Sequence, residues 1–515
     1  MTLTKRKNSE REELIEGGDS LPDGPSNIKG DELNIAVLVF LYTLQGIPLG
    51  LAGAVPMLLQ NRGITYTQQA EFSFVNWPFS VKLLWAPVVD AIFWQKFGRR
   101  KTWLVPVQYL IGIVMIMMSG GMSSWLGSDS EPPSMTILTI SFLFLNFLAA
   151  TQDIAVDGWA LTMLKRRNVG HASTCNTVGQ TTGFFLGYVL FLALESPYFC
   201  NKYLRDIPSD VGLVTLGSFL LFWGWVFIFT TTLVALFKHE AEEDTTANRR
   251  SEGTSNIVNA YQQLYAIIKL PAVRTLALVL FTAKIGFSAS DAVSGLKLVE
   301  AGVPREDLAL LAVPLVPVQI IMPIILAKHT TGPKPLSLWL KAFPLRLLVG
   351  PLVAGLVALT PSWLGNTGPS YFYLFVLMSL YVFHQTCLYC MFVAVMAFFA
   401  KVSDPTVGGT YMTLLNTVSN LGTNWPNTLA LWAIDHLTFK KCTAIEMFDN
   451  TCSSTLETEA CKNAGGTCST RIDGFYIEIG LCLVIGFLWL LWGKPTITRL
   501  QRLAPQSWQL RRTHR

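Results

Sequence analysis

The chain has 515 residues, of which 51% are hydrophobic and only 14% are charged, and its formal net charge is +5. Soluble domains carry about 25% charged residues, so this chain has too little charge to cover the surface of a soluble fold of its size. The mean hydropathy of +0.41 excludes an intrinsically disordered chain and argues against a large soluble enzyme. Composition therefore predicts a protein that crosses a membrane several times.

Residues 1–32 hold eight acidic and five basic side chains, so we expect no cleavable signal peptide there and predict a disordered cytosolic tail. Twelve mainly apolar runs follow, each long enough to cross a ~30 Å hydrocarbon core as a helix. These runs are 33–58, 68–92, 102–122, 135–161, 170–194, 212–237, 272–298, 307–327, 342–361, 371–400, 407–436 and 474–493. The predicted fold class is an all-α membrane protein with twelve transmembrane helices.

A polar connection, residues 238–271, divides these runs into an N-terminal six-helix half (33–237) and a C-terminal six-helix half (272–493). A short sequence similarity between the two halves supports this division. Residues 175–180 (Cys-Asn-Thr-Val-Gly-Gln) in the fifth run resemble residues 415–420 (Leu-Asn-Thr-Val-Ser-Asn) in the eleventh, as in membrane proteins built from parallel repeats.

The basic side chains predict the orientation. With the N-terminus in the cytosol, cytosolic segments hold 26 Lys and Arg residues, the opposite side holds eight, and five lie inside the runs. Because Lys and Arg concentrate in cytosolic loops, both termini are predicted to be cytosolic. The tail 494–515 alone carries six bases and no acid, which suits contact with anionic cytosolic lipid.

Ionisable groups inside a membrane span are costly and are candidates for function. In the fourth run Asp153 and Asp157 lie one helical turn apart on one face, and Lys82 in the second run is the natural partner for them. Two interpretations stay open. The acids form a proton-coupling or gating site, or they form a structural salt bridge with a base from a neighbouring helix.

The seventh run places Lys284, Ser288 and Asp291 on one helical face, with Lys284 a candidate ligand for an anion and Asp291 a candidate for coupling or gating. Lys297 and Arg346 lie nearer the ends of their runs and are expected to snorkel to the interface. His384, in the tenth run, is expected to be a hydrogen-bonding residue of the substrate site more than a proton carrier.

Neutral amides line the fifth and eleventh runs, and they either bind a polar ligand or hold helices together. They are Asn176, Gln180, Asn416 and Asn420. Glycines and prolines interrupt two other runs, at Gln45–Gly53 and at Pro314–Pro323. Each interruption is either unwound backbone that lines a cavity or a kink or close helix contact.

Four of the nine cysteines fall in one polar loop, 437–473, on the side opposite the cytosol. They are Cys442, Cys452, Cys461 and Cys468, and their spacing does not fit a zinc site. Because that side is oxidising in the secretory pathway, we predict two disulfides, with three connectivities open.

Neither a Gly-x-x-x-x-Gly-Lys-Ser/Thr nor a Gly-x-Gly-x-x-Gly motif occurs in the chain. These glycine-rich loops cradle phosphates in nucleotide-hydrolysing and dinucleotide-binding domains. No cofactor and no metal are therefore expected, and any transport would be secondary.

Five segments carry a family resemblance: 45–53 (Gln-Gly-Ile-Pro-Leu-Gly-Leu-Ala-Gly), 82–90 (Lys-Leu-Leu-Trp-Ala-Pro-Val-Val-Asp), 98–106, 151–159 (Thr-Gln-Asp-Ile-Ala-Val-Asp-Gly-Trp) and 401–412. Together they closely resemble the acetyl-coenzyme A transporter family, over about residues 33–493. Two of them, 82–90 and 151–157, also resemble bacterial muropeptide permeases, from which the cysteine loop is absent.

This resemblance implies a protein of the major facilitator type in the endoplasmic reticulum membrane. It would carry acetyl-CoA from cytosol to lumen for lumenal acetylation, with exchange for CoA as one option, and would not be an enzyme. Lys82 and Lys284, one in each half, would bind the phosphate groups of this substrate. Its partners would be that small molecule and the lipid bilayer, not nucleic acid, and a homodimer stays open. The alternatives are transport of another organic anion or peptide-like solute (glutathione disulfide or a muropeptide), or an acyltransferase that uses His384.

Overall fold

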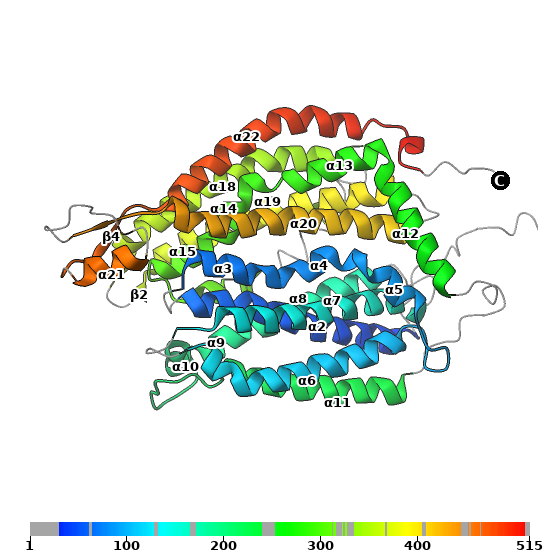
Figure 1. Cartoon of the computed structure of the whole chain (residues 1–515), viewed down its shortest axis with the longest axis horizontal. Coiled ribbons are helices and arrows are strands. Elements are labelled where there is room, and N and C mark those ends of the chain that lie inside the picture. The colour runs from blue at the N-terminus through cyan, green and yellow to red at the C-terminus, as the bar shows by residue number, and fades with distance from the viewer. Residues whose placement is uncertain are drawn as a thin grey trace, which may run out of the picture.

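The computed structural model describes residues 30–60, 64–127, 132–164, 171–238, 253–311, 313–315, 322, 325–326, 334–365, 368–403, 408–443, 452, 455–463 and 465–509. Long helices run along one common direction and form two bundles, one from the first part of the chain and one from the second (Figure 1). Nine helical stretches in these residues are long and apolar enough to cross a membrane. The all-helical, two-half architecture is confirmed.

The N-terminal half contains the first six predicted spans. Four spans are single helices: α2 (Glu32–Gln60), α6 (Lys101–Trp125), α7 (Met135–Met163) and α11 (Leu216–Phe237). The second span consists of α3 (Tyr66–Ser73), η1 (Phe74–Asn76), α4 (Trp77–Val81), η2 (Lys82–Leu84) and α5 (Ala86–Ala91). The fifth span consists of α8 (His171–Phe185), η4 (Leu186–Leu190) and α9 (Phe191–Glu195), and the short helix α10 (Pro197–Tyr203) follows it. The second span is broken because Pro78 and Pro87 lack the N–H group that a continuous helix needs.

The C-terminal half follows α12 (Gly253–Lys269), a helix inside the predicted linker. The seventh span consists of α13 (Pro271–Thr282), η5 (Ile285–Phe287), α14 (Ser288–Ala292) and α15 (Ser294–Glu300), and α16 (Arg305–Leu310) and η6 (Val313–Leu315) follow it. Four long helices come next: α18 (Leu336–Trp363), α19 (Tyr371–Val402), α20 (Gly408–Leu437) and α22 (Gly474–Leu500), with η8 (Pro505–Ser507) after the last. The strands β1 (Leu364–Gly365) and β2 (Gly368–Pro369) connect α18 to α19, and β3 (Phe439–Cys442), α21 (Thr455–Asn463) and β4 (Cys468–Ile472) connect α20 to α22. About half of the eighth predicted span, 307–327, lies outside the described residues, so the count of twelve stays a prediction.

The glycine-rich stretch of the first span serves close helix packing. Helix α2 is continuous through Gly46 and Pro48, and α8 crosses it so closely that a side chain at Gly183 would collide with the backbone of Thr43 and Gly46. Only glycine leaves room for two backbones at that distance. Of the two interpretations of residues 45–53, the structure supports packing over unwound backbone.

The two ends of the bundle differ. The hairpin of β3 and β4, together with α21, lies at one end, whereas α12 and the C-terminus lie at the other (Figure 1). The cysteine loop and the basic tail are therefore on opposite sides of any membrane that the helices cross, as the charge distribution predicts.

Candidate functional site

The first cluster of buried charge joins four elements of the N-terminal half. Asp153, on α7, is 3% exposed and forms an ion pair with Lys82, which begins η2. Gln45 of α2 and Gln180 of α8 donate to the same carboxylate at 2.5 and 3.3 Å. The predicted pairing of Lys82 with this face is confirmed, and Gln45 is a partner that the sequence analysis had not named.

Asp157, one turn further along α7, has its own donors. The Tyr42 hydroxyl donates to it at 2.8 Å and the Asn176 side chain at 3.2 Å. Both predicted amides of the fifth span, Asn176 and Gln180, thus bind the acids of the fourth. In this conformation both amides join α8 to α7, as the helix-joining interpretation proposed, although Asp157 itself is exposed.

The second cluster lies in the C-terminal half and is built around Asp291 of α14. Arg346 of α18 donates to it at 2.5 Å, and His384 Nε2 of α19 lies 3.8 Å from its other oxygen. Arg346 is 5% exposed and lies over the Phe287 ring at 4.4 Å. The expectation that Arg346 snorkels to the interface is therefore wrong, because a buried carboxylate holds it inside the bundle.

Lys284 is different from these ion-paired bases. It precedes η5, where the seventh span changes from α-helix to 3₁₀-helix, and its ammonium donates to the Ser419 carbonyl at 3.2 Å and to Thr423 Oγ1 at 2.5 Å. No carboxylate lies within ion-pair distance of it among the described residues. It lines a cavity of about 30 Å³ within the C-terminal half.

Several polar atoms near the second cluster have no hydrogen-bond partner among the described residues. They are one Asp291 oxygen, Arg346 Nε and His384 Nδ1. Asn416 is half-buried and Asn420 is exposed. Buried polar groups are normally satisfied, so this half retains hydrogen-bonding capacity that water or a polar solute can use. Glu478 of α22 is a further buried acid, 7% exposed, that the sequence analysis missed inside an otherwise apolar run.

The clusters differ in charge. The N-terminal one holds two acids and one base, whereas the C-terminal one holds two bases, Lys284 and Arg346, and one acid, Asp291. With each lysine and arginine protonated and each acid ionised, the two clusters carry opposite net charges. The cluster with the basic surplus is the C-terminal one.

Four polar links join the two halves near the cysteine-loop end. Tyr66 donates to Glu300 at 2.5 Å, Ser196 donates to Glu306 at 2.8 Å, the Thr67 N–H donates to Asp435 at 2.6 Å, and Arg305 forms an ion pair with Glu195. We call these four contacts the end links.

Lys297 supports the first of the end links. It lies 3.0 Å from Glu300 and 2.5 Å from Asp473, and its side chain is 6% exposed. The expectation that this lysine snorkels is also wrong, since two carboxylates and the Tyr66 ring surround it.

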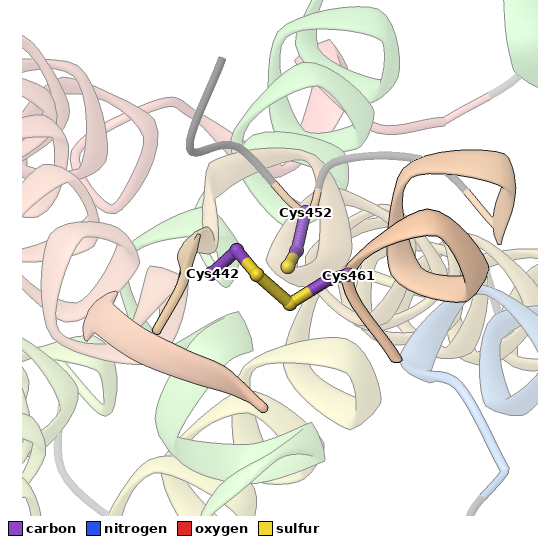
Figure 2. A group of neighbouring side chains, drawn as sticks. All are labelled: Cys442, Cys452 and Cys461. Atoms are coloured by element: carbon purple, nitrogen blue, oxygen red, sulfur yellow. A yellow bond between two sulfur atoms is a disulfide. The ribbon is translucent and has the colours of Figure 1, made fainter. Parts of the chain in front are cut away.

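The cysteine loop is closed by two disulfides, Cys442–Cys461 and Cys452–Cys468. The sulfur atoms of Cys442, Cys452 and Cys461 lie within 4.8 Å of one another (Figure 2). A thiolate is the form that binds a metal ion, and here both disulfides consume those thiols. Two disulfides were predicted, and the structure selects one of the three connectivities.

Comparisons with known proteins agree on a transporter. A profile of the family described as acetyl-coenzyme A transporter 1 matches residues 34–338 and 333–510. An uncharacterized protein of Schizosaccharomyces pombe is 35% identical over 93% of this chain and 89% of its own length. An uncharacterized membrane protein of Saccharomyces cerevisiae is 32% identical over 93% of this chain and 98% of its own. The anhydromuropeptide permease of Escherichia coli is 27% identical over 31% of each chain.

Solved structures show the same fold. The nucleoside transporter NupG has a TM-score of 0.53 at 13% identity, covering 89% of this chain and 99% of its own. A bacterial homolog of the human lysosomal transporter Spinster has a TM-score of 0.53 at 12% identity, covering 95% and 100%. The fold is that of the major facilitator type of transporter. By the profile match along its length, the chain belongs to the acetyl-coenzyme A transporter 1 family.

Proposed function

We propose that this protein carries acetyl-CoA from the cytosol into the lumen of the endoplasmic reticulum by alternating access, with CoA as a candidate exchange partner. The family match over most of the chain is the observation that carries this proposal. The two-bundle fold supports it, because alternating access rocks one half against the other around a site between them.

The charge distribution supports an anionic substrate. Acetyl-CoA carries phosphate groups, which bind cations and N–H donors. Lys82 is already neutralised by Asp153, whereas Lys284 contacts only neutral oxygens. We therefore assign the phosphate end of the substrate to the C-terminal half, with Lys284 as the principal ligand and His384, Asn416 and Asn420 as polar neighbours. From the sequence alone, Lys82 and Lys284 were equal candidates for binding the substrate.

In this proposal Asp153, Asp157 and Asp291 are coupling or gating residues. Their bonds to Lys82, Tyr42 and Arg346 hold each half together, so a change in those bonds would change the packing of the helices. The end links close one side of the substrate path in this conformation, and they must break for the path to open there.

Uptake by the purified full-length protein in liposomes tests the substrate. Acetyl-CoA is labelled separately on its acetyl group and on its adenine. We expect both labels to enter together, faster than into protein-free liposomes, and preloaded CoA to accelerate entry if exchange operates. Entry of acetyl alone would show transacetylation, the acyltransferase alternative. Entry of neither label would overturn the acetyl-CoA assignment.

A second candidate is a peptide-like or sugar-peptide solute, favoured by the similarity to the anhydromuropeptide permease over part of the chain. Competition separates the two. Unlabelled CoA should block uptake of labelled acetyl-CoA, whereas glutathione disulfide and an anhydromuropeptide should not. If either of these enters by itself at a higher rate than acetyl-CoA, the second candidate replaces the first.

A further inference from the structure

The last helix is longer than a membrane requires. Helix α22 has 27 residues, Gly474–Leu500, which at ~1.5 Å per residue gives a length of about 40 Å. The hydrocarbon core is only ~30 Å thick, and the apolar run of this helix ends at residue 493. Its last two turns therefore extend into the headgroup layer, at the end from which the C-terminus leaves (Figure 1).

Those two turns and the segment after them form a basic hollow of about 560 Å³ on the surface. It is lined by Lys494, Pro495, Thr498, Arg499, Arg502 and Leu503. None of its three bases forms an ion pair with a described residue, and residues 479–515 contain no Asp or Glu at all. The hollow therefore has three uncompensated positive charges, while the Thr498 hydroxyl donates to the Lys494 carbonyl at 2.7 Å.

The chain after α22 is folded back and holds this hollow in shape. Gln501 accepts a hydrogen bond from the Leu336 N–H at the start of α18, at 2.9 Å. Trp508 is 3% exposed, and its ring packs edge-on against Phe398 at 5.7 Å. These contacts distinguish the hollow from a loose basic tail.

An apolar stripe leads into the hollow along the same helix face. Spacings of three and four residues connect Leu481, Val484, Leu488 and Leu491 to Pro495 and Arg499, and such spacings place residues on one side of a helix. Arg502 follows just beyond the end of α22. The four apolar side chains are 48%, 58%, 61% and 75% exposed. No other described element covers them, so they face lipid chains.

We propose that this hollow binds the headgroup of an anionic glycerophospholipid in the cytosolic leaflet. The acyl chains lie along the apolar stripe, the phosphate lies between Arg499 and Arg502, and Lys494 contacts the remaining headgroup oxygens. Arginine forms paired N–H bonds with phosphate oxygens, and cytosolic leaflets supply the anionic lipid. The continuous stripe selects a lipid over a free anion, because a free anion gains nothing from an apolar neighbour.

The test measures lipid binding to the full-length protein by native mass spectrometry in detergent, with dioleoyl phosphatidylserine and dioleoyl phosphatidylcholine as probes. The variant Arg499→Gln/Arg502→Gln removes two charges from the hollow. Its matched control, Arg511→Gln/Arg512→Gln, removes two charges from the tail beyond it. Each base near a membrane surface is worth about fivefold in affinity, so the first variant should lose phosphatidylserine by about 25-fold and the control by less than about threefold.

Phosphatidylserine should also bind wild type more tightly than phosphatidylcholine, and water-soluble glycerophosphoserine should not displace it. Equal losses in the two variants would show a general charge effect and overturn the proposal. Equal binding of both lipids would do the same, and displacement by glycerophosphoserine would show an anion site instead. Thermal unfolding of both variants in lipid-free detergent should match wild type, so that a folding defect cannot mimic the loss.

Discussion

At the scale of single residues, the two intramembrane lysines have opposite surroundings. Lys82 lies against Asp153, with Asp157 nearby and donors around both acids. Lys284 lies against a carbonyl and a hydroxyl. The sequence identifies both as bases inside predicted spans, but it does not show that Lys284 has no counter-ion, because the groups around it come from another helix. The pairing of Lys82 was predictable from the helical face of α7, whereas the burial of Arg346 was not.

Neutralising each lysine should therefore have different effects. Lys82→Gln leaves the buried Asp153 without its counter-ion, and breaking a buried pair costs about 3–5 kcal/mol of stability. Lys284→Gln removes no counter-ion, so the free energy of unfolding should change by less than about 1 kcal/mol while the KM for acetyl-CoA rises about tenfold or more. Thermal unfolding in detergent and uptake kinetics in liposomes measure the two effects.

The double variant Lys82→Gln/Asp153→Asn is the control, since it removes both charges together. It should recover most of the stability that Lys82→Gln loses. If the double variant is as unstable as the single one, the ion pair is not what Lys82 contributes. If Lys284→Gln transports with an unchanged KM, the phosphate assignment is wrong.

At the scale of elements, apolar runs predict most helix positions because long apolar stretches have few alternatives in a membrane. The breaks in the second and seventh spans were not predictable in detail, because they depend on how neighbouring helices satisfy freed backbone groups. Helix α12 was not predicted, because it lies in a polar linker that has no long apolar run. Its Tyr261 hydroxyl donates to the Leu84 carbonyl at 2.5 Å, and its Leu264 and Ile267 side chains are buried in the core of the C-terminal half.

The contact between α2 and α8 predicts a sharp difference between two glycines. Gly183→Ala forces a methyl group into the backbone of α2 and should destabilise the protein by about 1–3 kcal/mol. Gly355→Ala, in α18, meets nothing within 4 Å and should be neutral or stabilise by up to about 1 kcal/mol. Thermal unfolding of both variants under the same conditions decides, and equal changes would contradict the close contact.

The cysteine loop predicts a specific peptide map. Digestion without reduction should yield fragments joined as Cys442–Cys461 and Cys452–Cys468, with the other five cysteines free. Each disulfide closes a loop of 16 to 19 residues. Closing a loop of that length stabilises the folded protein by about 3 kcal/mol in the chain-entropy view. The variant Cys452→Ser/Cys468→Ser should therefore unfold at a lower temperature. Four free thiols, or Cys442 linked to Cys452, would contradict the loop structure.

At the scale of the whole molecule, the distribution of charge predicted which ends of the helices share a side, and the structure agrees. How the halves meet was not predictable, because the end links join residues up to 368 positions apart in the chain. Glu195 and Arg305 illustrate this. Glu195 ends α9 and Arg305 begins α16, 110 positions later, and only the packing of these two helices brings them together.

If the end links close one side of the substrate path, fixing them should stop the cycle without abolishing binding. The pair Glu195→Cys/Arg305→Cys, cross-linked by a short bismaleimide, ties the two halves where the ion pair lies. Because maleimide linkage leaves the native disulfides intact, the loop stays folded. We expect uptake to fall by about tenfold or more, since alternating access needs this end to open, while detergent-solubilised protein still binds acetyl-CoA. The single variants, treated with the same reagent, should keep transporting. A cross-linked pair that transports at the parental rate would show that this end does not open during the cycle.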